Sequence, residues 1–144
     1  MLRVRQLRNR RQGGASLVEL ALVLFLLVLL LAAVVDFGRA YNSYIVITNA
    51  SREGAREASR FSNKPERIRV AARREAEGTG VDPDDLVIAI EPDPDNGPAA
   101  GPGEPITVIV EYGVPTILTD IVGLGSLPLR ARTEMVVFYD GTTE

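Results

Sequence analysis

The chain has 144 residues, enough for one small globular domain with appendages but too few for a large multidomain enzyme. It contains no histidine and no cysteine, so the usual ligands of zinc, haem and iron–sulfur sites and the thiols of disulfides are missing. The net charge of −3 conceals a strong segregation of charge along the sequence. The chain order of its basic, apolar and acidic segments is therefore the main source of functional information.

The first fourteen residues form a basic leader without any acidic residue. Its five arginines are Arg3, Arg5, Arg8, Arg10 and Arg11. The remaining chain carries 11 basic residues against all 19 acidic ones. Basic runs occur as nucleic-acid arms, as surface tails and as cytoplasmic flanks of membrane segments, and the sequence that follows favours the last of these.

An apolar run follows the leader, with sixteen residues from Leu20 to Val35 that include no polar side chain. A helix of about 20 residues, rising 1.5 Å per residue, crosses a hydrocarbon core of about 30 Å. We therefore expect a single transmembrane helix over about residues 17–36. The arginines before it and Asp36 after it predict a cytoplasmic N-terminus and an extracytoplasmic C-terminal domain, by the positive-inside bias.

Three fates of this N-terminal region are open at this point. A secretory signal peptide cut after Ala33 fits poorly, because Leu31 occupies a position that requires a small residue. An uncleaved signal anchor would keep the whole region. The third fate is proteolysis before the apolar run, where Gly13 and Gly14 are expected to break the helix and leave an extended backbone for a protease.

The segment from Gly13 to Glu19 resembles the processing site of type IV prepilins, in which a basic leader and a glycine precede a hydrophobic helix with a glutamate at position five. The resemblance implies cleavage between Gly14 and Ala15 by a prepilin peptidase. It also implies that Glu19 sets the register between subunits by meeting the new amine of Ala15. A carboxylate in the apolar helix costs up to about 2.5–3.5 kcal/mol, so a cationic partner or an unpartnered interfacial position is expected.

Two later segments extend the resemblance, Val35–Arg39 (VDFGR) and Asn49–Arg56 (NASREGAR). With the N-terminal segment they are similar to the TadE-like family of pilus-assembly proteins in tight-adherence (Flp) secretion systems, over roughly residues 12–60. The resemblance implies a minor pilin or pseudopilin in the cytoplasmic membrane. Its implied partners are the membrane, a prepilin peptidase, other pilin or pseudopilin subunits and the pilus assembly platform. The alternative is an uncleaved, membrane-anchored extracytoplasmic binding or adhesion module.

The N-terminal helix is predicted to continue beyond the membrane and to cover residues 15–60. Tyr41 and Tyr44 follow the apolar run, where amphipathic rings favour the headgroup region. A stripe of mostly small side chains then recurs at helical spacing and permits close approach of another backbone. Its members are Ile47, Ala50, Gly54, Ala58 and Phe61, of which Ala50, Gly54 and Ala58 are the candidate helix-packing residues. The partner is either the chain's own C-terminal domain or another subunit.

We expect an exported α/β head over residues 61–144 and hence an α+β, pilin-like fold. A second helix is predicted over Pro65–Glu77, capped by Ser62 or Asn63 and ended by Gly78 and Gly80. Runs typical of strands predict an antiparallel sheet of about three strands, against which a helix packs. These runs are Leu86–Ile90, Ile106–Tyr112 and Leu129–Tyr139. Residues 92–105 and 113–128 are expected to be loops, with a short turn around 117–122.

The sequence predicts neither catalysis nor a cofactor. Asp93–Gly97 departs from the spacing of a calcium loop, and Lys64 lacks the glycine-rich lead of a phosphate-binding loop. A serine hydrolase triad requires histidine. The arginines of the second predicted helix are diluted by glutamates in a segment expected to be exported, which argues against nucleic-acid binding. We therefore expect no catalytic residue, no metal site and no nucleic-acid partner.

Overall fold

The structure, a computed structural model, describes residues 12–118, 123 and 125–138. Its elements are helix α1 (Gln12–Ala58), helix α2 (Pro65–Arg74), the 3-10 turn η1 (Pro83–Asp85) and strands β1 (Val87–Glu91), β2 (Pro105–Pro115) and β3 (Ser126–Val136). The arginines of the leader, Tyr139 and most of the turn expected around 117–122 lie outside the described residues. The expected α+β, pilin-like arrangement is confirmed.

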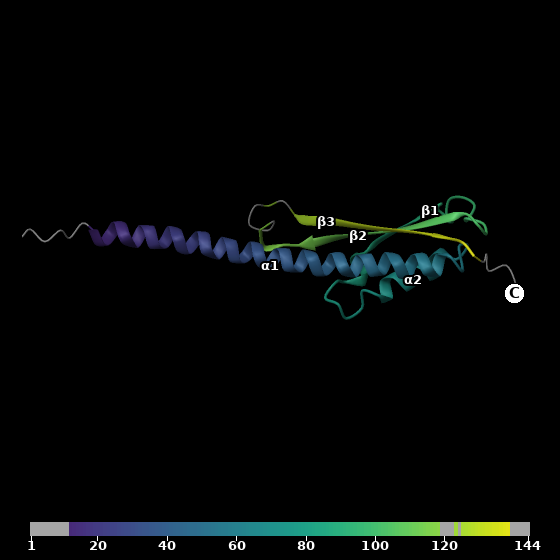
Figure 1. Cartoon of the computed structure of the whole chain (residues 1–144), viewed down its shortest axis with the longest axis horizontal. Coiled ribbons are helices and arrows are strands. Elements are labelled where there is room, and N and C mark those ends of the chain that lie inside the picture. Colours follow the sequence, from purple (N-terminus) through teal and green to yellow (C-terminus); the bar gives the residue numbers. More distant parts are fainter. Residues whose placement is uncertain (1–11, 119–122, 124, 139–144) are drawn as a thin grey trace, which may run out of the picture.

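Helix α1 has 47 residues, which corresponds to about 70 Å at 1.5 Å per residue. Its N-terminal half projects alone, and its C-terminal half lies along the sheet (Figure 1). Helix α1 is described from Gln12 and runs through both glycines, so the expectation that Gly13 and Gly14 break it is wrong. Glycine lowers helix propensity by about 1 kcal/mol relative to alanine, yet its backbone enters the right-handed helical region freely. Two glycines in the first turn therefore weaken the helix without ending it.

The three strands form one antiparallel sheet in the order β1-β2-β3. Val108 in the central strand pairs with Ile90 on one side and with Thr133 on the other. The three predicted strands are present, but β3 ends at Val136, so its predicted continuation through 137–138 is wrong. The β2–β3 pairing instead extends to Pro115 and Ser126, so 113–115 and 126–128 are strand rather than loop. Gly113 supports this extension, because a Cβ at that position would lie 2.5 Å from Ser126 Oγ.

The core lies between the C-terminal half of α1 and the inner face of the sheet. Ile106, Val108 and Val110 alternate along β2 and are fully buried. Two side-chain hydroxyls join the layers, because Ser51 Oγ of α1 lies 2.8 Å from Thr133 Oγ1 of β3. The backbone N–H of Phe138 also donates to Ser59 O at 2.9 Å, which fastens the chain after β3 to the end of α1.

Helix α2 packs on α1 and is shorter than predicted, because it ends at Arg74. Its N-cap is Lys64, whose side chain makes no capping hydrogen bond, so the predicted caps are wrong. The Lys64 carbonyl already accepts the first helical N–H, from Ile68, which leaves residues 62–63 in the preceding turn. Phe61 is also outside the α1 stripe, because α1 ends before it. The Arg67 guanidinium covers its ring at 3.8 Å.

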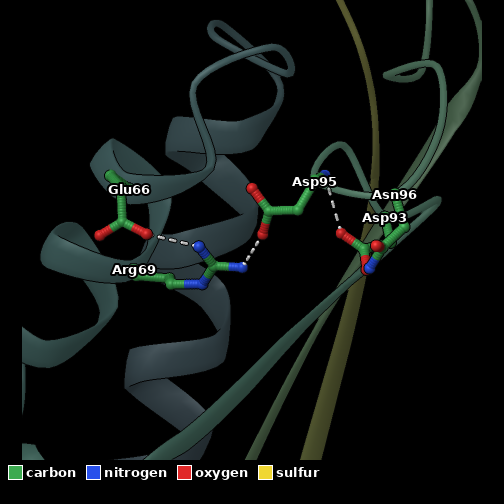
Figure 2. Close-up of polar contacts among 5 residues, drawn as sticks. All are labelled: Glu66, Arg69, Asp93, Asp95 and Asn96. Carbon is green, nitrogen blue, oxygen red and sulfur yellow. Dashed lines mark hydrogen bonds and ion pairs between the residues drawn. The ribbon is translucent and has the colours of Figure 1, made fainter.

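An ionic and hydrogen-bonded network fastens the β1–β2 connection to α2 (Figure 2). Arg69 of α2 pairs with Glu66 one turn earlier and with Asp95 of the connection. Asp93 accepts from the side chain of Asn96 at 2.7 Å and from the backbone N–H of Asp95 at 2.9 Å. Both hydrogen bonds stabilise its carboxylate and lower the pKa of Asp93. The connection is irregular, as predicted, and side chains hold its shape.

Candidate processing and assembly site

The N-terminal half of α1 is an apolar surface with no covering element in the described part of the chain. Its large side chains are exposed from Leu17 through Leu31, and Phe25, for example, is 68% exposed. Among the described residues, α1 is the one helix long and apolar enough to cross a membrane by length and composition. Exposed apolar surface costs about 25 cal/mol per Å² in water. Burial of this half of the helix in an apolar environment is therefore favourable.

The Gly14–Ala15 bond lies in the first turn of α1, and both residues are exposed. A Cβ built on Gly14 meets no other described side chain or non-local backbone within 4 Å, so this position is open in the described part of the chain. The structure thus places the predicted cleavage point on an exposed stretch of α1 close to the first described residue.

Glu19 lies one helical turn after Ala15, which is the position required by the predicted pairing. Its side chain is exposed and borders a shallow depression lined by Ser16, Leu20 and Val23. Side chains on a helix lean toward its N-terminus, so the Glu19 carboxylate leans toward the turn that contains Ala15. No basic group of the described residues pairs with it. The carboxylate can therefore accept an external cation or a newly formed amine.

The three candidate helix-packing residues, Ala50, Gly54 and Ala58, are buried inside the chain's own head. A Cβ on Gly54 would lie 3.0 Å from Val108 Cγ1 and 3.3 Å from Ala72 Cβ, so Gly54 is where α1, α2 and β2 meet. Of the two partners left open by the sequence, the structure places the chain's own sheet and second helix against this stripe. Its small side chains join the long helix rigidly to the head.

Asp36 is a structural residue whose contact sequence reasoning missed. It is only 6% exposed, and its two carboxylate oxygens accept the backbone N–H groups of Ile117 and Leu118, each at 2.8 Å. These N–H groups start a short helical turn after β2, where a carboxylate is a favourable cap. In the sequence, an acidic residue directly after an apolar run indicates the membrane orientation, but nothing near it points to Ile117 and Leu118 as partners.

Three aromatic rings, Phe37, Tyr41 and Tyr44, lie on one face of α1 just beyond Asp36. Phe37 and Tyr41 stack with their centroids 6.5 Å apart, and both rings are largely exposed. Tyr44 is also about half exposed on the next turn. Rings of this type favour the boundary between lipid and water, so the predicted interfacial position of Tyr41 and Tyr44 fits their exposure.

No group of three histidine, cysteine, aspartate or glutamate side chains with the geometry to hold a metal ion occurs among the described residues. The Asp93 carboxylate, part of the segment tested above as a calcium loop, is occupied by Asn96 and the backbone of Asp95. The described part of this surface is therefore that of an apolar helix with one acidic group, Glu19.

The comparison with known protein families matches a part of helix α1 and not the whole chain. Residues 14–56 match the family described as TadE-like protein. This match contains Gly14, Ala15, Glu19, Asp36 and Gly54, and it ends two residues before the end of α1. No curated protein and no solved structure matches the chain.

Proposed function

We propose, from the premise that residues 14–56 are a TadE-like domain, that this protein is a minor pilin or pseudopilin of a tight-adherence (Flp) pilus system. The TadE-like family is associated with assembly of these pili, and its proteins are structural rather than catalytic. In this proposal a prepilin peptidase cuts between Gly14 and Ala15. The shortened protein then joins other pilin or pseudopilin subunits at the pilus assembly platform.

The observation that carries the proposal is the division of α1 into two halves. One half is buried under the chain's own sheet, and the other is apolar and fully exposed in its most hydrophobic stretch. A soluble monomer would not leave so large an apolar surface in water. A subunit that is first embedded in the cytoplasmic membrane and later packs among similar helices in the fibre buries this apolar surface in both places.

Charge supports the proposed orientation, with the N-terminus inside and the head outside. The five arginines of the leader precede the apolar helix, and Asp36 lies where it ends. Lys and Arg are enriched on the cytoplasmic side of membrane segments. This orientation presents the Gly14–Ala15 bond at the cytoplasmic surface and exports the acidic head.

Glu19 and the amine of Ala15 would guide assembly after cleavage. The cut removes the arginine-rich leader and creates one positive charge a single turn away from Glu19. In lipid, a carboxylate with a cation beside it is far less costly than one without. A staggered neighbouring helix can bring its own amine to Glu19, and this pairing would fix the offset between subunits.

Co-expression of the full chain with a prepilin peptidase tests the processing step. We expect the mass to correspond to a chain that starts at Ala15, and Gly14→Val to abolish this shift. Gly38→Val is the matched control, because Gly38 is a second helical glycine with nothing within 4 Å of its Cβ position. A start at Met1 would favour the uncleaved binding module, and a start near Val34 would favour a secreted domain. Either result would contradict the proposal.

A further inference from the structure

A cavity beside α1, just beyond the apolar half, combines polar groups with an apolar wall of Tyr112, Val114 and Pro115, and the proposed function does not use it. It has a volume of about 370 Å³ and lies between α1, the turn after α2 and strand β2. This volume falls within the range of about 300–1,000 Å³ that is typical of small-molecule sites. Its polar lining includes Arg39, Asn42 and Ser43 from α1 and Thr79 and Gly80 from the turn.

The donors that line the cavity are largely unused. Arg39 makes no ion pair or hydrogen bond with any other described residue. Ser43 is only 6% exposed, and its hydroxyl likewise has no hydrogen-bond partner in the described part of the chain. The amide of Asn42 donates one long hydrogen bond, at 3.4 Å, to Thr79 O. Among the described residues, the side-chain atom that is buried without a partner is Arg73 Nε, so the unpaired Ser43 hydroxyl is reachable from the cavity that it lines and is available to a hydrogen-bonding ligand.

The charge and position of the cavity select that ligand. A guanidinium with free amide and hydroxyl groups beside it is the donor set that binds phosphate oxygens. Arg39 lies three residues after Asp36, and Asn42 lies six residues after Asp36. The two residues are therefore about 4.5 and 9 Å further along the helix than Asp36. The headgroup layer adds roughly 5–8 Å to each side of the hydrocarbon core. The cavity therefore opens at the level of lipid phosphates if the apolar run ends in the membrane at Asp36.

We propose that this cavity binds the phosphate of a phospholipid headgroup, with Arg39 as its cation and the Ser43 hydroxyl as a second donor. The inference rests on the membrane-spanning part of the proposed function and is independent of cleavage at Gly14. Asp82 and Asp85 act electrostatically on Tyr112, which also lines the cavity, and both oppose an anion. The attraction between the phosphate and the site therefore depends on Arg39, and the affinity for the lipid should decrease as salt screens it.

Native mass spectrometry of the full chain, released from detergent with bound lipids, tests the site. The two probes are phosphatidylglycerol and a diacylglycerol with the same acyl chains, which lacks the phosphate. We expect the wild type to retain phosphatidylglycerol about tenfold more strongly, and Arg39→Gln to abolish the difference. Ser43→Ala should reduce the preference about threefold. Equal retention of both lipids by the wild type would overturn the proposal.

Two controls separate this site from general surface charge. Arg52→Gln removes an exposed α1 arginine that does not line the cavity, and it should leave retention unchanged. Gly38→Arg combined with Arg39→Gln moves the guanidinium around the helix at nearly the same depth, and Gly38 has open space for it. Restored retention in this double variant would overturn the proposal, as would displacement of the lipid by millimolar inorganic phosphate. Membrane fractionation and the N-terminal mass, read on the same samples, report insertion and cleavage separately.

Discussion

The carboxylate of Asp36 accepts the backbone N–H of Ile117 at 2.8 Å across 81 positions of the sequence. Its second oxygen accepts the N–H of Leu118 at the same distance. The bond joins the point where the apolar half of α1 ends to the connection that follows β2. The base of the head is thereby fixed to the helix at the level where the membrane surface is proposed to lie.

Removal of this carboxylate should loosen the base of the head. Asp36→Ala leaves two partly buried backbone donors without their acceptor, which costs up to about 1–3 kcal/mol. We expect faster hydrogen exchange at the amides of Ile117 and Leu118, measured by mass spectrometry on the full chain in detergent. Asp36→Asn, which keeps one acceptor oxygen, should give an intermediate rate. Unchanged exchange in Asp36→Ala would show that the contact contributes nothing to the order of this connection.

Gly54 should tolerate no larger side chain. Gly54→Leu forces a side chain into the contact between Val108 and Ala72, where a Cβ alone would already lie at 3.0 and 3.3 Å. Overpacking of this kind costs about 1–3 kcal/mol. We expect a lower midpoint of thermal unfolding, whereas Gly38→Leu, with nothing within 4 Å, should leave the head unchanged. Equal midpoints for the two variants would remove the close-contact explanation of Gly54.

Arg69 should restrain the β1–β2 connection more than it stabilises the fold. Its ion pairs with Glu66 and Asp95 are partly exposed, and such pairs contribute about 0.2–1 kcal/mol. Arg69→Gln should therefore leave the unfolding midpoint nearly unchanged and accelerate hydrogen exchange over residues 93–97. Glu66→Gln keeps the pair with Asp95 and should exchange like the wild type. If hydrogen exchange over residues 93–97 accelerates equally in both variants, the helix and not the Arg69–Asp95 pair restrains the connection.

Glu19 should matter for assembly and not for insertion. Glu19→Ala removes the one acidic group of the apolar half, so membrane insertion becomes easier rather than harder. We expect normal membrane fractionation but loss of incorporation into the pilus fraction, measured by immunoblotting of both fractions. Leu20→Ala, a neighbouring change without loss of charge, is the control. Normal incorporation of Glu19→Ala would remove the proposed register role.

Local pattern was sufficient to predict most of the fold. The uninterrupted apolar run predicted the exposed half of α1, and alternating residues such as Ile106, Val108 and Val110 predicted the buried face of β2. The helix-packing stripe was also visible in the spacing of Ala50, Gly54 and Ala58. These features depend on residues that lie close together in the sequence.

The features that the sequence did not reveal depend on distant partners or on small energy differences. The Asp36 carboxylate accepts a backbone N–H from Ile117, 81 residues away, and no local pattern joins the two. The Gly13–Gly14 pair was expected to break the helix, but a penalty of about 1 kcal/mol per glycine is too small to decide this from sequence. The cavity around Arg39 and Ser43 could not be predicted from the sequence either, because it forms only where the turn after α2 lies beside α1.

The mass of the native subunit, isolated from sheared pilus material of a strain that produces the fibre, tests the central claim most directly. The account predicts a polypeptide that begins at Ala15, with Glu19 at its fifth position. Native subunits that still begin at Met1 in an assembled fibre would contradict it.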